Sequence, residues 1–153
     1  MLTIVPADSR HIATIAGNMR EADRAEVWAS SGLNPLEALT VSLQWSKLAW
    51  TALDGDTPFI MWGVTPFLNV PNTGSPWLLG TSLIERYPTF FLRNSRPYVA
   101  QMLEAYPQHI NYVDVRNRLS VRWLQWCGYK LVDFLPEYGH ARLPFYQFSQ
   151  IRG

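Results

Sequence analysis

The spacing of apolar residues along the chain changes from the period of a strand to that of a helix and back. In the first third it predicts a short strand over residues 2–5 and helical structure over residues 11–28. Because Gly17 lies inside the helical stretch, that stretch is either one helix bent near the glycine or two helices in succession. A further helix is predicted over residues 34–44, with Asn34 as its cap and a proline as its first residue.

The middle of the chain reads as strands followed by a helix. Residues 47–53 and 58–64 are strand-like, and the Asp-Gly-Asp-Thr segment between them predicts a hairpin. A loop rich in proline, asparagine and glycine is predicted over residues 70–76, and a third strand over residues 77–84. Residues 86–106 are irregular or helical up to their internal proline and helical after it.

The most informative stretch is a strand, a helix and a second strand near the end of the chain. Polar and apolar residues alternate over 111–115, Asn117 can cap the helix, and Gly128 can end it before a strand over 129–134. A glycine turn then leads to a last strand over residues 143–148. The complete order predicts an α/β (α+β) fold with a mixed, mostly antiparallel sheet and helices on both faces. No linker or repeat divides the chain, so we expect a single domain spanning residues 1–153.

Composition narrows the classes of function. Apolar residues make up 48% of the chain and charged ones 16%, with seven each of Trp, Tyr and Phe. Some of these aromatics are expected at a groove or a protein contact, unless the core is itself rich in large side chains. The formal charge is +1 without a basic run, so we expect no nucleic-acid partner. Apolar runs stay far below the roughly 20 residues of a membrane helix, which predicts a soluble protein. One cysteine and isolated histidines predict neither a disulfide nor a metal site.

The late helix carries the spacing on which a family resemblance rests. Asn117, Ser120, Leu124, Gly128 and Tyr129 match the places where the Gcn5-related N-acetyltransferases (GNAT) have Asn, a small residue, Tyr, Gly and an aromatic. The order of the predicted elements resembles that family over nearly the whole chain. The resemblance implies a GNAT fold, acetyl-CoA as the cofactor with no other, and an amine or a protein lysine as the acceptor. It also makes Asn117 a candidate cofactor-binding residue.

The phosphate-binding part of that family's pattern is missing. There, backbone N–H groups of a glycine-containing loop after the fourth strand hold the pyrophosphate of CoA, but this chain has no glycine between Gly80 and Gly128. Three arginines can hold phosphate by charge-assisted hydrogen bonds instead, or they lie on a solvated face or pair with Glu85 and Glu104. They are Arg86, Arg93 and Arg96.

The proton-transfer groups are incomplete as well. Leu124 stands where the family has the tyrosine that reprotonates the departing thiolate, and leucine has no proton to give. The candidate catalytic bases are Glu26, near the helices that shape the acceptor site in the family, and Glu85, at the end of the predicted strand before the long helix. Glu26 also lies in a run of alternating charges that a solvated helix face would explain.

A narrower resemblance concerns the internal virion proteins of short-tailed phages, which share an acetyltransferase-like fold. It rests on residues 20–24 with 26–28, on 91–93 with 95–96, and on 111–128. It implies other phage or virion proteins as partners, and the host cytoplasm during assembly or the virion interior as the location.

We therefore expect an acetyltransferase-like protein that acts in virion assembly or as an internal virion component, with catalysis reduced or lost. An active acetyl-CoA-dependent N-acetyltransferase is the alternative, and a toxin or host-directed modifier is a third hypothesis.

Overall fold

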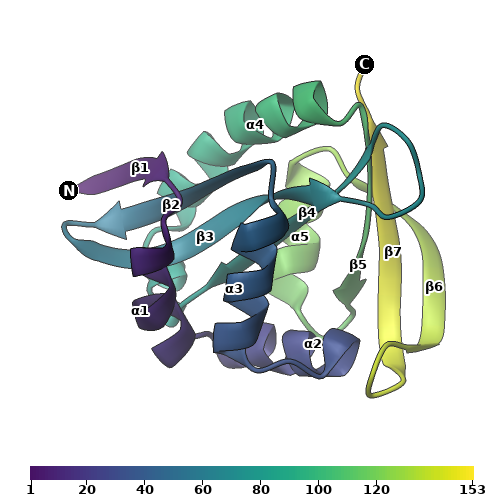
Figure 1. Cartoon of the computed structure of the whole chain (residues 1–153), viewed down its shortest axis with the longest axis horizontal. Coiled ribbons are helices and arrows are strands. Elements are labelled where there is room, and N and C mark those ends of the chain that lie inside the picture. Colours follow the sequence, from purple (N-terminus) through teal and green to yellow (C-terminus); the bar gives the residue numbers. More distant parts are fainter.

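A seven-stranded sheet runs through the computed structural model, which describes all of residues 1–153 (Figure 1). The strand order is β1-β2-β3-β4-β5-β7-β6, and every neighbouring pair is antiparallel except β4 and β5. The strands are β1 (Leu2–Pro6), β2 (Leu48–Asp54), β3 (Thr57–Pro66), β4 (Thr73–Gly80), β5 (Gln108–Asp114), β6 (Lys130–Tyr138) and β7 (Leu143–Ile151). The helices are α1 (Ile12–Gly17), α2 (Glu21–Ser31), α3 (Pro35–Trp45), α4 (Pro88–Ala105) and α5 (Arg118–Trp126).

Helices cover both faces of the sheet, as the sequence predicts. In Figure 1, α1, α2 and α3 lie in front of the sheet, and α4 and α5 lie behind it. Side chains of a strand point alternately to the two faces, so each helical layer meets its own set of strand residues. Met61 and Leu79 pack with the front helices, whereas Val64 and Val113 pack with α4 and α5.

Local capping signals in the sequence set the ends of several helices. Asn34 caps α3 in a reciprocal capping box with Glu37, and Asn117 accepts the Ser120 N–H at the start of α5. Gly128 follows α5 with φ of +94°, a conformation that side chains rarely adopt. The stretch over residues 11–28 forms two helices, α1 and α2, rather than one bent helix.

The strand boundaries beside the β4–β5 junction were predicted wrongly. β4 begins at Thr73 and not at residue 77, and residues 82–86 form a 3-10 helix instead of continuing the strand. Pro76 is tolerated inside β4 because its nitrogen, which carries no hydrogen, faces the edge where β4 has no partner strand. β5 likewise begins earlier than predicted, at Gln108.

Residues 88–105 form one continuous helix, which settles the open prediction for this region. Pro97 lies inside α4 on its exposed side, and the helix continues through it. The final hairpin matches the prediction, with Gly139 in its turn at φ of +75° and with both strands longer than expected.

The strands β4 and β5 touch at one end only. Their parallel register contains two residue pairs, Thr73 with Gln108 and Gly74 with His109, and beyond these the strands diverge. The junction is tight because a Cβ at Gly74 would lie 2.6 Å from Val64 Cγ2 and 2.7 Å from Tyr106 Cδ2.

Replacing Gly74 should therefore weaken the fold. We expect Gly74→Ala to lower the free energy of unfolding by about 1–3 kcal/mol, because the added methyl group overpacks the junction. Urea unfolding measures the change. The matched control is Gly17→Ala, where a Cβ meets nothing within 4 Å and stability should stay the same or rise slightly. Equal losses in the two variants would contradict the tight junction.

Candidate active site

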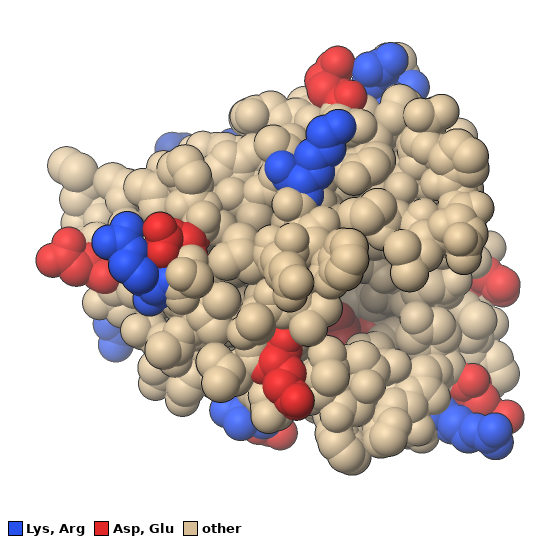
Figure 2. Space-filling view, viewed as in Figure 1, with Lys and Arg blue, Asp and Glu red and all other residues tan.

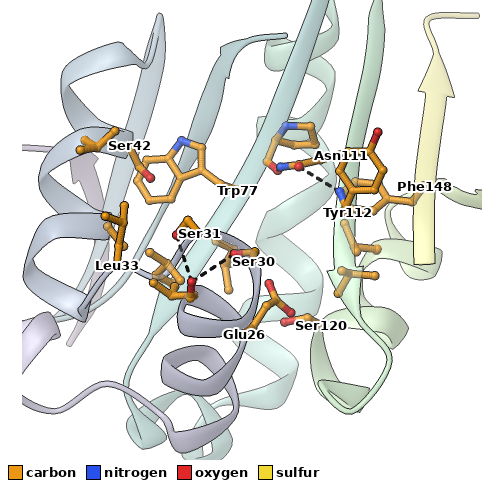
Figure 3. Close-up of a pocket in the computed structure, with 18 of the residues that line it drawn as sticks. Glu26, Ser30, Ser31, Leu33, Ser42, Trp77, Asn111, Tyr112, Ser120 and Phe148 are labelled. Atoms are coloured by element: carbon orange, nitrogen blue, oxygen red, sulfur yellow. Dashed lines mark hydrogen bonds between the residues drawn. The ribbon is translucent and has the colours of Figure 1, made fainter. Parts of the chain in front are cut away.

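A cavity of about 340 Å³ lies where β4 and β5 diverge. Residues of α2 and α3 line it together with Trp123 and Leu124 of α5, which covers the opposite face of the sheet, so the cavity passes through the gap between the strands. In Figure 3, Trp77 and Tyr112 stand on opposite sides of this space and Glu26 lies between them. Figure 2 shows this face as mostly uncharged, with a hollow that has acidic atoms at its floor.

The open end of the gap is bridged by a buried carboxylate of α2. Asp23 Oδ2 accepts the backbone N–H of Gly80, the last residue of β4, at 3.0 Å. Asp23 Oδ1 accepts from Arg20 Nη1 at 2.8 Å and from Asn117 Nδ2 at 2.9 Å. The Asp23 side chain is 1% exposed and that of Arg20 8%. This ion pair is stable inside the protein because additional hydrogen bonds satisfy the carboxylate.

Glu26 extends the same bridge to β5. Its Oε1 accepts the backbone N–H of Asp114 at 3.1 Å and Asn117 Nδ2 at 3.2 Å. We call Arg20, Asp23, Glu26 and Asn117 the α2 clasp, because together they join α2 to the diverging ends of β4 and β5.

The electrostatics of the clasp favour a proton on Glu26. Burial raises the pKa of Glu26 to about 8, and the neighbouring Asp23 carboxylate adds to this increase. The pKa of Asp23 is also raised by burial, against the opposing effect of Arg20. Glu26 is thus a carboxyl group that exchanges a proton near neutral pH beside an accessible cavity, as a general base requires.

Side chains also satisfy most other polar groups along the gap. Asn111 donates from Nδ2 to the Pro76 carbonyl at 2.8 Å and accepts the Tyr112 N–H at 2.9 Å. Backbone groups alternate in direction along a strand, so Leu78 presents its N–H and C=O to the gap as Pro76 and Gly80 do. No side chain takes up these groups of Leu78, which leaves them free to bind a ligand that contains an amide.

A second hollow, of about 460 Å³, lies between the start of α4 and α5. Its lining combines mainly apolar residues with Glu85 and Arg122. No side chain caps the start of α4, and Pro88 as its first residue contributes no N–H. The start of α4 therefore offers an anion fewer backbone donors than a glycine loop would.

The structure brings two of the predicted site residues together and leaves the other four elsewhere. Glu26 and Asn117 meet in the clasp. The others are exposed, either in the 3-10 helix before α4 or within α4, and do not line the cavity between β4 and β5, namely Glu85, Arg86, Arg93 and Arg96.

The side chains of the three arginines are exposed. None pairs with Glu85 or Glu104, and Glu104 pairs instead with Arg152 at 3.1 Å. Arg96 donates to the Trp126 carbonyl at 3.0 Å, and its guanidinium carbon lies 4.0 Å from the centroid of that indole ring.

Glu26 does not lie on a solvated helix face, which was one of the alternatives that the sequence left open for it, and two neighbouring charged residues are buried as well. Arg20 and Asp23 are buried, and Glu26 faces the cavity. The signal that sequence reasoning missed is their spacing, because positions 20, 23 and 26 follow one side of a helix next to the apolar Val27.

The aromatic and proline side chains that precede and begin α4 do not fill the gap. The Tyr87 hydroxyl donates to Asp54 at 2.9 Å, and Pro88 lines the second hollow. Phe90 packs with the cluster around Phe59. Leu124 does line the cavity, so the position of the family's acid faces the gap without a titratable group.

Solved structures of acetyltransferases and putative acetyltransferases share this architecture. A putative phosphinothricin N-acetyltransferase superimposes with a TM-score of 0.74 at 12% identity, covering 100% of this chain and 99% of its own. A GCN5-related N-acetyltransferase from Kribbella flavida gives 0.68 at 16% identity, covering 98% and 97%. The chain has the GNAT fold. A putative acetyltransferase from Salmonella typhimurium, determined with its cofactor acetyl-CoA, gives 0.68 at 11% identity, covering 99% and 94%. No protein-family profile and no curated protein sequence matches the chain.

Two further classes of feature are absent from the structure. No helix is long and apolar enough to cross a membrane. No group of three or more His, Cys, Asp or Glu side chains is placed to hold a metal ion.

The raised pKa of Glu26 predicts how stability depends on pH. Between the unfolded value near 4.5 and the folded value of about 8, the native state keeps a proton that the unfolded chain has released. The free energy of unfolding should fall through this range as pH rises, by about 1.4 kcal/mol per unit of pKa difference, and level off above it. Glu26→Gln keeps an oxygen acceptor and should remove this part of the pH dependence.

Urea unfolding of both proteins from pH 5 to 9 measures the difference. Glu21→Gln is the matched control, because the Glu21 side chain on the same helix is 88% exposed. Identical pH profiles for Glu26→Gln and the unmodified chain would contradict the raised pKa.

Proposed function

We propose that the chain is an acetyl-CoA-dependent N-acetyltransferase that acts on an amine, with Glu26 as its general base. The observation that carries the proposal is the placement of Glu26, held by the Asp114 N–H and by Asn117 at the wall of the cavity between β4 and β5. A carboxyl group with a pKa near the working pH can take a proton from an amine as the amine attacks.

The cofactor fits the gap better than it fits the start of α4. Acetyl-CoA supplies an acetyl group activated as a thioester. The free N–H and C=O of Leu78 would bind its amide-containing arm, and Arg122 with Arg86 or Arg93 would bind its phosphates. Because the phosphate loop has no glycine, we expect weaker binding than a glycine loop would give.

Glu26 has two roles in the proposed reaction. It takes the proton of the attacking amine while the new N–C bond forms and the C–S bond breaks. Leu124 cannot act as an acid, so Glu26 is also the one carboxyl group lining the cavity that can return this proton to the departing thiolate. Asn117 positions Glu26 through the hydrogen bond from Nδ2.

The proposal predicts a pH-dependent acetyl transfer that requires Glu26. With acetyl-CoA and a panel of primary amines, kcat/KM should rise with pH and level off above about 8. Glu26→Gln should lower kcat by about 10²–10⁴-fold and abolish the rise, because the general base is lost. Thiol release measured by absorbance follows the reaction, and Glu21→Gln should react like the unmodified chain. A fully active Glu26→Gln would overturn the assignment.

A second candidate function rests on different observations. The acid position holds Leu124, the phosphate loop has no glycine, and large apolar side chains are exposed on α2, α3 and the β3–β4 loop, namely Trp28, Trp45 and Leu68. With the sequence resemblance to phage internal virion proteins, these features support a protein that acts through contacts with other virion proteins, with catalysis reduced or lost. It would act in the host cytoplasm during assembly or inside the virion.

Two measurements separate this candidate from the enzyme. The virion function predicts that mass spectrometry finds the chain in purified particles of a phage that encodes it, and its absence there would count against an internal component. It also predicts no heat of binding when acetyl-CoA is titrated into the protein. Tight stoichiometric binding of acetyl-CoA would exclude a virion protein that binds no cofactor.

A further inference from the structure

The charge of the cavity restricts what it can bind. Glu26 is the only residue with a carboxyl group among the 20 that line it, and no Lys, Arg or His is present. A cationic guest can pair with Glu26, whereas a buried carboxylate on the guest would have no basic partner and would lose its hydration without compensation. A second ammonium group on the guest would be unpaired because the cavity lining has no second carboxyl group.

The walls of the cavity are aromatic on both sides of Glu26. Trp77 of β4 stands opposite Tyr112 of β5 (Figure 3), and Tyr112 stacks on Tyr138 with ring centroids 4.4 Å apart. Phe148 lines the same side. A flat apolar group can be held between such rings, and an ammonium next to them gains attraction from their faces.

Several polar side chains of the cavity wall already have partners within the protein. The Ser30 and Ser31 hydroxyls both donate to the Val27 carbonyl, at 3.2 and 3.0 Å. Trp77 donates its indole N–H to Ser46 at 2.8 Å.

On the basis of the proposed function, we infer that the acceptor is a small monocationic primary amine that carries a flat apolar group and no carboxylate. The cavity of about 340 Å³ must hold the acetyl group as well as the acceptor, which keeps the amine small. Its ammonium lies at Glu26 and its apolar group lies between Trp77 and Tyr112.

Calorimetric titration of the purified chain, with and without saturating CoA, tests this directly. The probes are 2-phenylethylamine, phenylalanine, which differs from it by a carboxylate, butylamine, which lacks the ring, and spermidine, which adds charges. We expect 2-phenylethylamine to bind at least 10-fold more tightly than the other three. Equal or tighter binding of phenylalanine or spermidine, or no binding of 2-phenylethylamine under either condition, would overturn the inference.

Two variants test the contacts. Glu26→Gln should weaken the binding of 2-phenylethylamine at least 10-fold, and Tyr112→Leu should weaken it several-fold. Glu21→Gln should leave the affinity unchanged. Unfolding curves establish that each variant is folded, and unchanged affinity in a folded Glu26→Gln contradicts the proposed pairing. Because binding is measured without turnover, tight binding of 2-phenylethylamine without acetyl transfer would refute the enzyme and leave the binding site intact. Acetyl transfer to phenylalanine or spermidine but not to 2-phenylethylamine would refute the inferred acceptor and leave the proposed enzyme function intact.

Discussion

The divergence of β4 and β5 is the constraint on which the rest of the site depends. Two strands that separate inside a sheet expose backbone N–H and C=O groups that need partners as much as those of a helix end do. Asp23 and Glu26 supply acceptors for the last residues of the two strands, and Asn111 supplies both a donor and an acceptor farther in. The gap therefore stays open as a cavity because α2 side chains, rather than a third strand, complete its hydrogen bonds.

The α2 clasp both holds the fold together and sets the protonation state of Glu26. The carboxylates of Asp23 and Glu26 share the amide of Asn117, and the nearby Asp23 carboxylate helps to raise the pKa of Glu26. Arg20 pairs with Asp23 only, which leaves Glu26 as the group that holds a proton. A cation in the cavity would favour the ionised form of Glu26, and a proton acceptor would thereby form next to the ligand that needs it.

Much of the fold follows from local signals, whereas the site does not. Asn34, Asn117 and Gly128 mark helix ends through contacts within a few residues, and the sequence places them correctly. The edge that lets Pro76 lie inside β4 exists only after the strands have paired, so the start of β4 was predicted four residues late. Asp23 looks like one more surface charge until β4 and β5 are present to receive it, and only Glu26 and Asn117 of the clasp were found from the sequence.

The α2 clasp joins segments that are far apart in the sequence and are therefore synthesised at different times. Asp23 and Asn117 are separated by 94 residues, and Glu26 and Asp114 by 88. During synthesis, α2 leaves the ribosome long before β5 and α5 exist, so its carboxylates remain hydrated until that late segment emerges. Final docking of α2 thus waits for the C-terminal third of the chain, and the cavity forms only when almost the whole protein has been made.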